Sequence, residues 1–520
     1  MNNLEPRWLI AAAALWMSVG IACTPTTSAP SSPAAQEISD HPPDAEAGEA
    51  PVQREETWMA CYINGSKIGY THLVVEPASE DGRACLRFQY DDELKIRRFD
   101  AETVVRTRLT SLETAAGQLL SFRSEMQAGP GVMVTEGRRE GGQLQLRTLN
   151  EGKVDEQSLP WQPDYGGFFA DQQSLRREPL RPGQSRRLQC LLPILHLVGE
   201  VHLKAVAWEA IELPSGSRQL LRIEITTQAG AAQLKSLLWT DEEGRPHKVK
   251  DLQLGMEAVV TTREQALRPA DAGGFDLGFD AIVRIEQPLP DPHQTQRIVY
   301  RARLQDGDAQ TLFASSLSQA VRGLDDGAVE VTVQAVRPDR PPSVADHPIE
   351  PPTAADRTAS TMLQSDDPLV VQLAQAVAAD ETDAWAIACA LEREVKQKIR
   401  LKNYTTAMAT AAEVARSLEG DCTEHAMLLA ALCRARDIPA RVAIGLVYYP
   451  SAGGFAYHMW TEVWITDRWI PLDATLGLGG IGAAHLKLAH SSMQGTAAYA
   501  ELLPVIQALG RLQLEIIRRE

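Results

Sequence analysis

The stretch that decides the fold of the C-terminal third is Leu418–Ala426, which reads LEGDCTEHA. Asp421 fits the N-cap of a helix, and Glu424, three residues later, completes a capping-box pattern. Apolar residues follow at helical spacing, so the sequence predicts a helix with one buried face. Cys422 falls at its first position, where free N–H groups and the helix dipole stabilise a thiolate. The sequence therefore singles out Cys422, rather than Cys433 on the apolar stripe, as the reactive thiol.

Two strand patterns follow this helix, and the second of them, Tyr457–Ile465, reads YHMWTEVWI. A tight turn then leads into the residues RWIPLD. If Ile465 pairs with Arg468, Asp473 lies on the same face as His458, one diagonal step away. A slip of one residue would move it to the other face. The sequence thus predicts a hairpin that brings His458 and Asp473 together.

These three residue types supply the parts of a thiol catalytic triad. A thiol is weakly ionised at neutral pH and needs a base or a lowered pKa to become a nucleophile. His458 can accept the proton of Cys422 and return it to a leaving group. Asp473 can hold the imidazole in the useful tautomer. The backbone N–H of Cys422 can donate to the oxyanion of an acyl intermediate.

The same residues resemble the three motifs of the transglutaminase-like superfamily. The resemblance covers roughly residues 366–482, and a common Gly of the family is replaced by Asp437. The matching stretches are GDCTEHA at 420–426 with RDIPAR at 436–441 for the nucleophile, HMWTEVW at 458–464 for the histidine, and WIPLDAT at 469–475 for the aspartate.

The resemblance implies a papain-like α+β core, with the Cys helix packed on an antiparallel sheet, and acyl transfer from an amide through a thioester. The acceptor is water in a cysteine peptidase or amidase and an amine in a cross-linking transglutaminase. We expect hydrolysis of a protein or peptide substrate. The alternatives are protein cross-linking and a non-catalytic envelope binding module. No EF-hand pattern is present, so metal-dependent cross-linking is not supported, and we expect neither a metal nor a cofactor.

The first 23 residues have the character of an export signal. Arg7 precedes an uncharged apolar run, Trp8–Ala22, which is short for a membrane-spanning helix of about 20 residues. The run ends VGIAC, which resembles a bacterial lipoprotein signal with Cys23 as the lipidated residue. We therefore expect an exported bacterial protein in the periplasm or cell envelope, reaching the membrane only through a signal or lipid anchor.

The rest of the chain divides by composition. Residues 24–56 are rich in Pro, Ser and Ala and predict a disordered tether. Short alternating runs over 57–265, with an Asn64–Gly65 hairpin signal, predict a largely antiparallel β domain. Residues 266–352 predict a small β domain and a Pro-rich linker, and 353–520 the transglutaminase-like domain. Within the last, Ala497–Ile517 predicts an amphipathic helix, and we interpret His485 and His490 as surface or packing residues.

Composition narrows the classes of partner. The net charge is -17, with an isoelectric point near 5.2, which excludes the basic footprint of a nucleic-acid-binding protein. The seven cysteines are too sparse for a disulfide scaffold and lack zinc-ligand spacing. A disulfide between Cys61 and Cys85 stays open, as does the oligomeric state.

Overall fold

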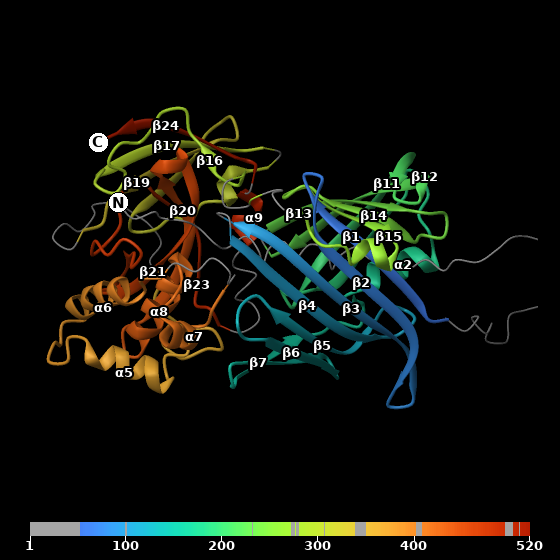
Figure 1. The fold of residues 1–520 in the computed structure, drawn as a ribbon, viewed down its shortest axis with the longest axis horizontal. Helices are drawn as coiled ribbons and strands as arrows, with labels where there is room; N and C mark the ends of the chain where they lie inside the picture. Colours follow the sequence, from blue (N-terminus) through green and yellow to red (C-terminus); the bar gives the residue numbers. More distant parts are fainter. Residues whose placement is uncertain are drawn as a thin grey trace, which may run out of the picture.

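The computed structural model describes residues 53–98, 101–230, 232–271, 276, 280–305, 307–337, 350–401, 408–494, 503–508 and 510–520. The expected export signal with Cys23, most of the expected tether and residues 338–349 of the Pro-rich linker lie outside these ranges. Strands dominate the described residues, and helices gather near the C-terminal third (Figure 1).

The N-terminal lobe is one 15-stranded sheet in which almost every strand pairs antiparallel with its neighbour in sequence. It runs β8-β7-β6-β5-β4-β3-β2-β1-β15-β14-β13-β12-β11-β10-β9, and only the β9–β10 pairing is parallel. The prediction of a largely antiparallel β region is confirmed. The strands are β1 Glu55–Ile63, β2 Ser66–Glu80, β3 Arg83–Arg98, β4 Ala101–Glu113, β5 Leu119–Gln127, β6 Met133–Glu140, β7 Gln143–Asn150, β8 Lys153–Pro160, β9 Tyr165–Gly166, β10 Ser185–Leu192, β11 Leu197–Leu213, β12 Gly216–Ala229, β13 Ala232–Thr240, β14 Pro246–Asp251 and β15 Met256–Thr261.

The hairpin between β1 and β2 shows why this sheet forms where it does. Asn64 and Gly65 both have positive φ, 49° and 82°, as a two-residue hairpin turn requires. Helices α2 Ala170–Arg177 and α3 Arg263–Ala266 belong to the same lobe.

Cys61 lies on β1 and Cys85 on β3, with β2 between them, and both are free thiols. The disulfide left open by the sequence is therefore not formed.

The C-terminal lobe holds two smaller sheets. One has five strands, ordered β16-β21-β20-β23 with β22 on the outside of β21, and the other is ordered β18-β19-β17-β24. Their bounds are β16 Val283–Arg284, β17 Arg297–Leu304, β18 Gln319–Gly323, β19 Val329–Gln334, β20 Ala440–Tyr449, β21 Gly454–Ile465, β22 Arg468–Leu472, β23 His485–Ser491 and β24 Leu512–Arg519.

The C-terminal tail differs from the sequence prediction. The amphipathic helix expected over Ala497–Ile517 is wrong for most of its described part. Among the described residues of this segment, a short helix, α9 Leu503–Ala508, is the only helical part, and β24 follows and pairs antiparallel with β17. Residues 512–515 read LQLE and alternate buried and exposed, which is strand periodicity, and the long-range pairing with β17 decides between the two patterns.

Helices cover one side of the five-stranded sheet (Figure 1). Asp367, Asp383, Thr410 and Asp421 cap the starts of α5, α6, α7 and α8 with side-chain hydrogen bonds. Their bounds are α5 Pro368–Ala376, α6 Ala384–Lys398, α7 Ala411–Ser417 and α8 Cys422–Arg434, and short 3₁₀ turns lie at Ala309–Thr311, Ala354–Asp356 and Pro450–Ala452. Every residue of α8 is buried, so this helix is the centre of the lobe.

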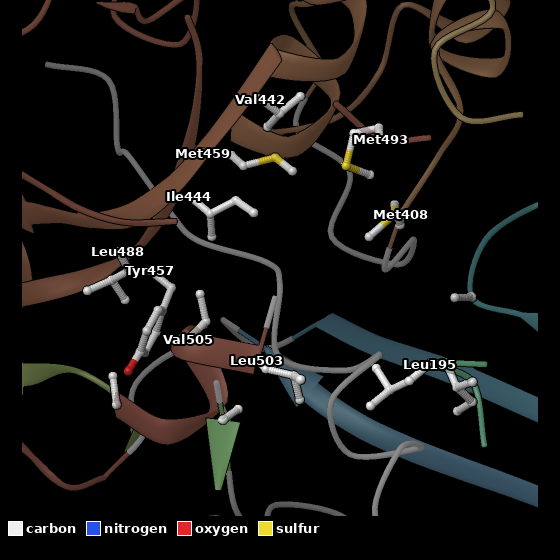
Figure 2. Close-up of a cluster of buried hydrophobic side chains, with 14 of the residues drawn as sticks. Leu195, Met408, Val442, Ile444, Tyr457, Met459, Leu488, Met493, Leu503 and Val505 are labelled. Atoms are coloured by element: carbon white, nitrogen blue, oxygen red, sulfur yellow. The ribbon is translucent and has the colours of Figure 1, made fainter. Parts of the chain in front are cut away.

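The two lobes share one apolar core. Figure 2 shows the part in which Leu503 and Val505 of α9 lie between Leu195 of the N-terminal lobe and the β20–β21 hairpin. Hydrogen bonds also cross the boundary: the Asn150 side chain donates to the Thr361 carbonyl at 3.3 Å. Within the described ranges, no helix is long and apolar enough to cross a membrane.

Candidate active site

Cys422 is held at the first position of α8 by the predicted capping box. The Asp421 side chain accepts the Thr423 N–H at 3.0 Å, and Glu424 accepts the Asp421 N–H at 2.9 Å. Gly420 precedes them with φ of 143°, where a Cβ would lie 2.4 Å from the Glu424 side chain. Glycine therefore lets the chain turn into the helix, and the thiol is fixed where it begins.

His458 and Asp473 meet through the predicted hairpin register. Ile465 pairs with Arg468, and the two turn residues between them both have positive φ. Nε2 of His458 lies 2.9 Å from Oδ2 of Asp473, and the Thr475 N–H donates to Oδ1 at 2.9 Å. The register prediction is confirmed, and it brings the two side chains into direct contact.

The other ring nitrogen of His458, Nδ1, has different surroundings from Nε2. Nδ1 is buried and has no hydrogen-bond partner among the described residues. The N–H of Met459, the next residue, donates to the sulfur of Cys422. Further along β21, the Thr461 hydroxyl donates to the Ala426 carbonyl of α8 at 3.0 Å. The strand and the helix are thus held side by side, with the thiol against the backbone of the residue that follows His458.

All three side chains are buried: Cys422, His458 and Asp473 each expose 0% of their surface. Burial raises the pKa of the Cys422 thiol well above its usual range, and the carboxylates of Asp421, Glu424 and Asp473 act in the same direction. In this conformation desolvation outweighs the helix start, which by itself would favour a thiolate. In this conformation the thiol is neutral.

For Asp473, neighbouring groups outweigh burial in setting the pKa. Burial alone would raise the pKa of its carboxyl, but the electrostatic attraction and hydrogen bonds of two adjoining histidine rings, His458 and His485, hold it well below its usual range. The carboxylate is ionised at neutral pH and accepts hydrogen bonds only. It can therefore fix the imidazole of His458 with the proton on Nε2.

The sequence profile of the transglutaminase-like superfamily matches residues 371–474, which include all three side chains. This chain carries a transglutaminase-like domain. No curated protein sequence matches the chain.

Solved structures resemble parts of the chain distantly. A presumed cysteine protease from Cytophaga hutchinsonii is 16% identical, with 42% of this chain and 86% of that one covered and a TM-score of 0.28. A β-barrel-like protein of unknown function from Brucella abortus is 8% identical, with 41% and 98% covered and a TM-score of 0.30. A presumed protease from Parabacteroides distasonis is 11% identical, with 53% and 64% covered and a TM-score of 0.17. These TM-scores are too low to carry an argument.

His485 is a member of the site that sequence analysis missed. It opens β23, exposes 1% of its surface, and places Nε2 3.1 Å from the same Oδ2 of Asp473 that meets His458. For His485 the surface interpretation is wrong, since the residue is buried, and packing is only part of its role, since it also contacts Asp473. His490 fits it better, since it is half-buried and lies 3.5 Å from Glu350 near the surface. No local signal marks His485, because its position depends on the pairing of β23 with β20.

Two further acidic residues of the transglutaminase-like domain support the site. Glu392 of α6 is fully buried and accepts the Gly479 N–H at 2.8 Å, and burial raises its pKa to about 8. It thereby holds the turn that follows Asp473. Glu462, inside the histidine motif, pairs with Lys487 at 2.6 Å and with Arg441 at 2.8 Å. Its role is to tie three strands of the catalytic sheet together.

His458, Asp473 and His485 also bear on the question of a metal. Each offers one ligand atom, and the three atoms lie within 4.8 Å of one another. Two histidines and a carboxylate form a donor set that zinc accepts. However, Nε2 of His458 and Nε2 of His485 already lie at hydrogen-bond distance from Oδ2 of Asp473. Two N–H···O hydrogen bonds therefore account for the arrangement without a metal.

Proposed function

We propose that the transglutaminase-like domain is a thiol enzyme that cleaves peptide or amide bonds by acyl transfer to water. The observation that carries the proposal is the state of His458. Its Nε2 is engaged by Asp473, and its Nδ1, next in the chain to the strand residue that contacts Cys422, has no partner in the part of the chain that the structure describes. A histidine so placed is suited to take a proton from the thiol.

The proposed reaction has two halves. The Cys422 thiol gives its proton to Nδ1 of His458 while the sulfur forms a bond to the carbonyl carbon of the substrate. The C–N bond then breaks, and the leaving amine takes the proton from His458, which leaves a thioester on Cys422. In the second half a water molecule gives a proton to His458 and adds to the thioester. The C–S bond breaks, the thiol regains its proton, and a carboxylic acid is released.

Charge develops on the carbonyl oxygen in both halves. The N–H of Cys422, at the start of α8, is one donor suited to that oxygen. The ionised Asp473 offsets the positive charge that His458 acquires when it holds the proton. The same machinery would serve an amine acceptor, so cross-linking differs from hydrolysis only in which nucleophile reaches the thioester.

A non-catalytic role is favoured by one observation, the complete burial of the three side chains. A binding module could retain this constellation as a structural hydrogen-bond network, with the large N-terminal sheet as the binding surface.

The test is a mass-spectrometric digest of a mixed peptide pool in ¹⁸O-labelled water with a primary amine added. Hydrolysis puts ¹⁸O into new carboxyl ends, cross-linking puts the amine there, and a binding module produces neither. Cys422→Ala abolishes either product if the proposal holds. Product formation that survives Cys422→Ala would overturn it.

We further propose that the protein acts in the cell envelope after export, on a protein or peptide substrate. The support is the apolar run before Cys23 in the sequence. Metabolic labelling with an alkyne fatty acid, with Cys23→Ser beside it, tests the lipid anchor. Label that persists in Cys23→Ser, or none in the parent chain, would contradict lipidation at Cys23.

A further inference from the structure

We propose that His485 is a positioning residue of the transglutaminase-like domain, which donates its Nε2–H to Asp473 and so holds His458 in the tautomer that leaves Nδ1 available to Cys422. This inference deepens the proposed function and rests on it. It assigns His485 no contact with substrate.

Asp473 accepts three hydrogen bonds in the structure. Its Oδ2 accepts from His458 at 2.9 Å and from His485 at 3.1 Å, while Oδ1 accepts the Thr475 N–H at 2.9 Å. A carboxylate anchored at both oxygens cannot rotate without losing a hydrogen bond. With all three groups excluded from water, each lost bond leaves a buried polar atom unpaired.

His485 is itself fixed on several sides. It pairs with Val447 across β20 and β23, and its ring meets that of Trp460 edge to face, with centroids 5.5 Å apart and an angle of 89°. The ring of His293, from the segment before β17, packs against it at 6.0 Å. The other nitrogen, Nδ1, lies 3.3 Å from the Gly482 carbonyl. The ring therefore has one orientation toward Asp473.

The tautomers follow from counting protons. A neutral imidazole has one N–H, and an ionised carboxylate only accepts. Both histidines must then carry the proton on Nε2 to avoid a contact between two lone pairs at Oδ2. For His485, the 3.1 Å contact with Asp473 is shorter than the 3.3 Å contact with Gly482, so Nε2 keeps the proton. For His458, the result is an Nδ1 lone pair, which is what a base for Cys422 needs.

The experiment compares three variants in the full-length chain. His485→Gln retains an N–H donor at about the place of Nε2, and His485→Leu removes it at similar volume. His490→Leu is the matched control, since His490 lies on the same strand but contacts Glu350 rather than the triad. Circular dichroism and thermal melts first establish that each variant folds.

Two readouts separate positioning from packing. ¹⁵N-histidine NMR, with the His458 signals assigned by their loss in His458→Gln, reports which ring nitrogen carries the proton. Iodoacetamide alkylation of Cys422, followed by peptide mass spectrometry, reports the reactivity of the thiol. We expect His458 to lose its uniform Nε2–H state in His485→Leu, and Cys422 alkylation to fall by roughly tenfold. His485→Gln should recover both to within about threefold, and His490→Leu should leave both unchanged.

The outcomes also separate this inference from the proposed function. If His485→Leu leaves the His458 tautomer and the alkylation rate unchanged, or if His485→Gln fails as badly as His485→Leu in a folded chain, the positioning role is refuted even where peptide cleavage stands. If His485→Leu shifts the tautomer and His485→Gln restores it, positioning is supported, even where the cleavage assay finds no hydrolysis and the proposed function falls.

Discussion

His458 Nε2 lies 2.9 Å from Asp473 Oδ2, and neither residue exposes any surface to solvent. A buried carboxylate that contacts an imidazole controls where the imidazole proton resides. The first prediction therefore concerns this contact.

Asp473→Asn should keep the shape of the site and lose the ionised acceptor. The amide offers His458 either an acceptor or a donor, and the donor orientation selects the wrong tautomer. We expect peptide cleavage to fall by a factor of about 10⁴, as for the analogous change in a serine triad. The rate is measured as kcat/KM on a peptide cleaved by the parent chain. Asp437→Asn, in the turn after α8, is the control, and equal rates for Asp473→Asn and the parent chain would contradict the role of Asp473.

The pH dependence of Cys422 alkylation should follow its burial. Because burial raises the pKa of this thiol, the unliganded protein holds it neutral, and alkylation by iodoacetamide should be slow near pH 7 and still rise beyond pH 9. A stopped reaction series from pH 5 to 10, quantified by peptide mass spectrometry, checks this. A plateau reached below pH 7 would show a preformed thiolate and contradict the neutral pair.

Glu113 in the N-terminal lobe should make stability fall with rising pH. Burial raises its pKa to about 8, although Ser111 and backbone N–H groups donate to it. The folded chain therefore keeps a proton that the unfolded chain loses near pH 4.5. As the pH rises from about 4.5 to about 8, the free energy of unfolding falls, because the unfolded chain is ionised at Glu113 and the folded chain is not. The cost is up to roughly 1.4 kcal/mol for each pH unit in that window.

The measurement is the thermal midpoint of the parent chain and Glu113→Gln at pH 5, 6.5 and 8. Glutamine cannot ionise, so the thermal midpoint of Glu113→Gln should rise relative to that of the parent chain as the pH increases. Glu242→Gln, at an exposed position, is the control. A difference between Glu113→Gln and the parent that is constant over the whole range would show that Glu113 does not retain its proton.

Glu392 should stabilise the folded chain through its hydrogen bond to Gly479 rather than through a negative charge. Since its pKa is raised to about 8, it is largely protonated at pH 7, and Glu392→Gln should cost little. Glu392→Leu leaves the Gly479 N–H without its acceptor and should cost about 1–3 kcal/mol. Urea unfolding compares the two variants. Equal costs for Gln and Leu would mean that packing, and not the hydrogen bond, holds the turn after Asp473.

The sequence was most informative where local rules act. The capping box at Asp421 and the two-residue turn before Arg468 each depend on residues a few positions apart, so both were predictable, and the register they fix brings His458 to Asp473. The hairpin turn at Asn64–Gly65 in the β region follows the same logic.

What could not be predicted depends on contacts between distant segments. His485 reaches Asp473 only because β23 pairs with β20, and β24 replaces the expected helix because β17 offers it an edge. The pKa of Cys422 depends on complete burial beneath the rest of the lobe, which outweighs the local effect of the helix start. These pairings cannot be predicted from residues that are close together in the sequence.

The most direct test of the central claim is acyl transfer to Cys422 from a general donor, p-nitrophenyl acetate. A burst of p-nitrophenolate, with an acetyl group found on Cys422 by peptide mass spectrometry and lost in His458→Gln, is the result that a Cys422–His458–Asp473 acyl-transfer site predicts. No burst, or acetylation at other residues that continues undiminished in Cys422→Ala, would contradict it.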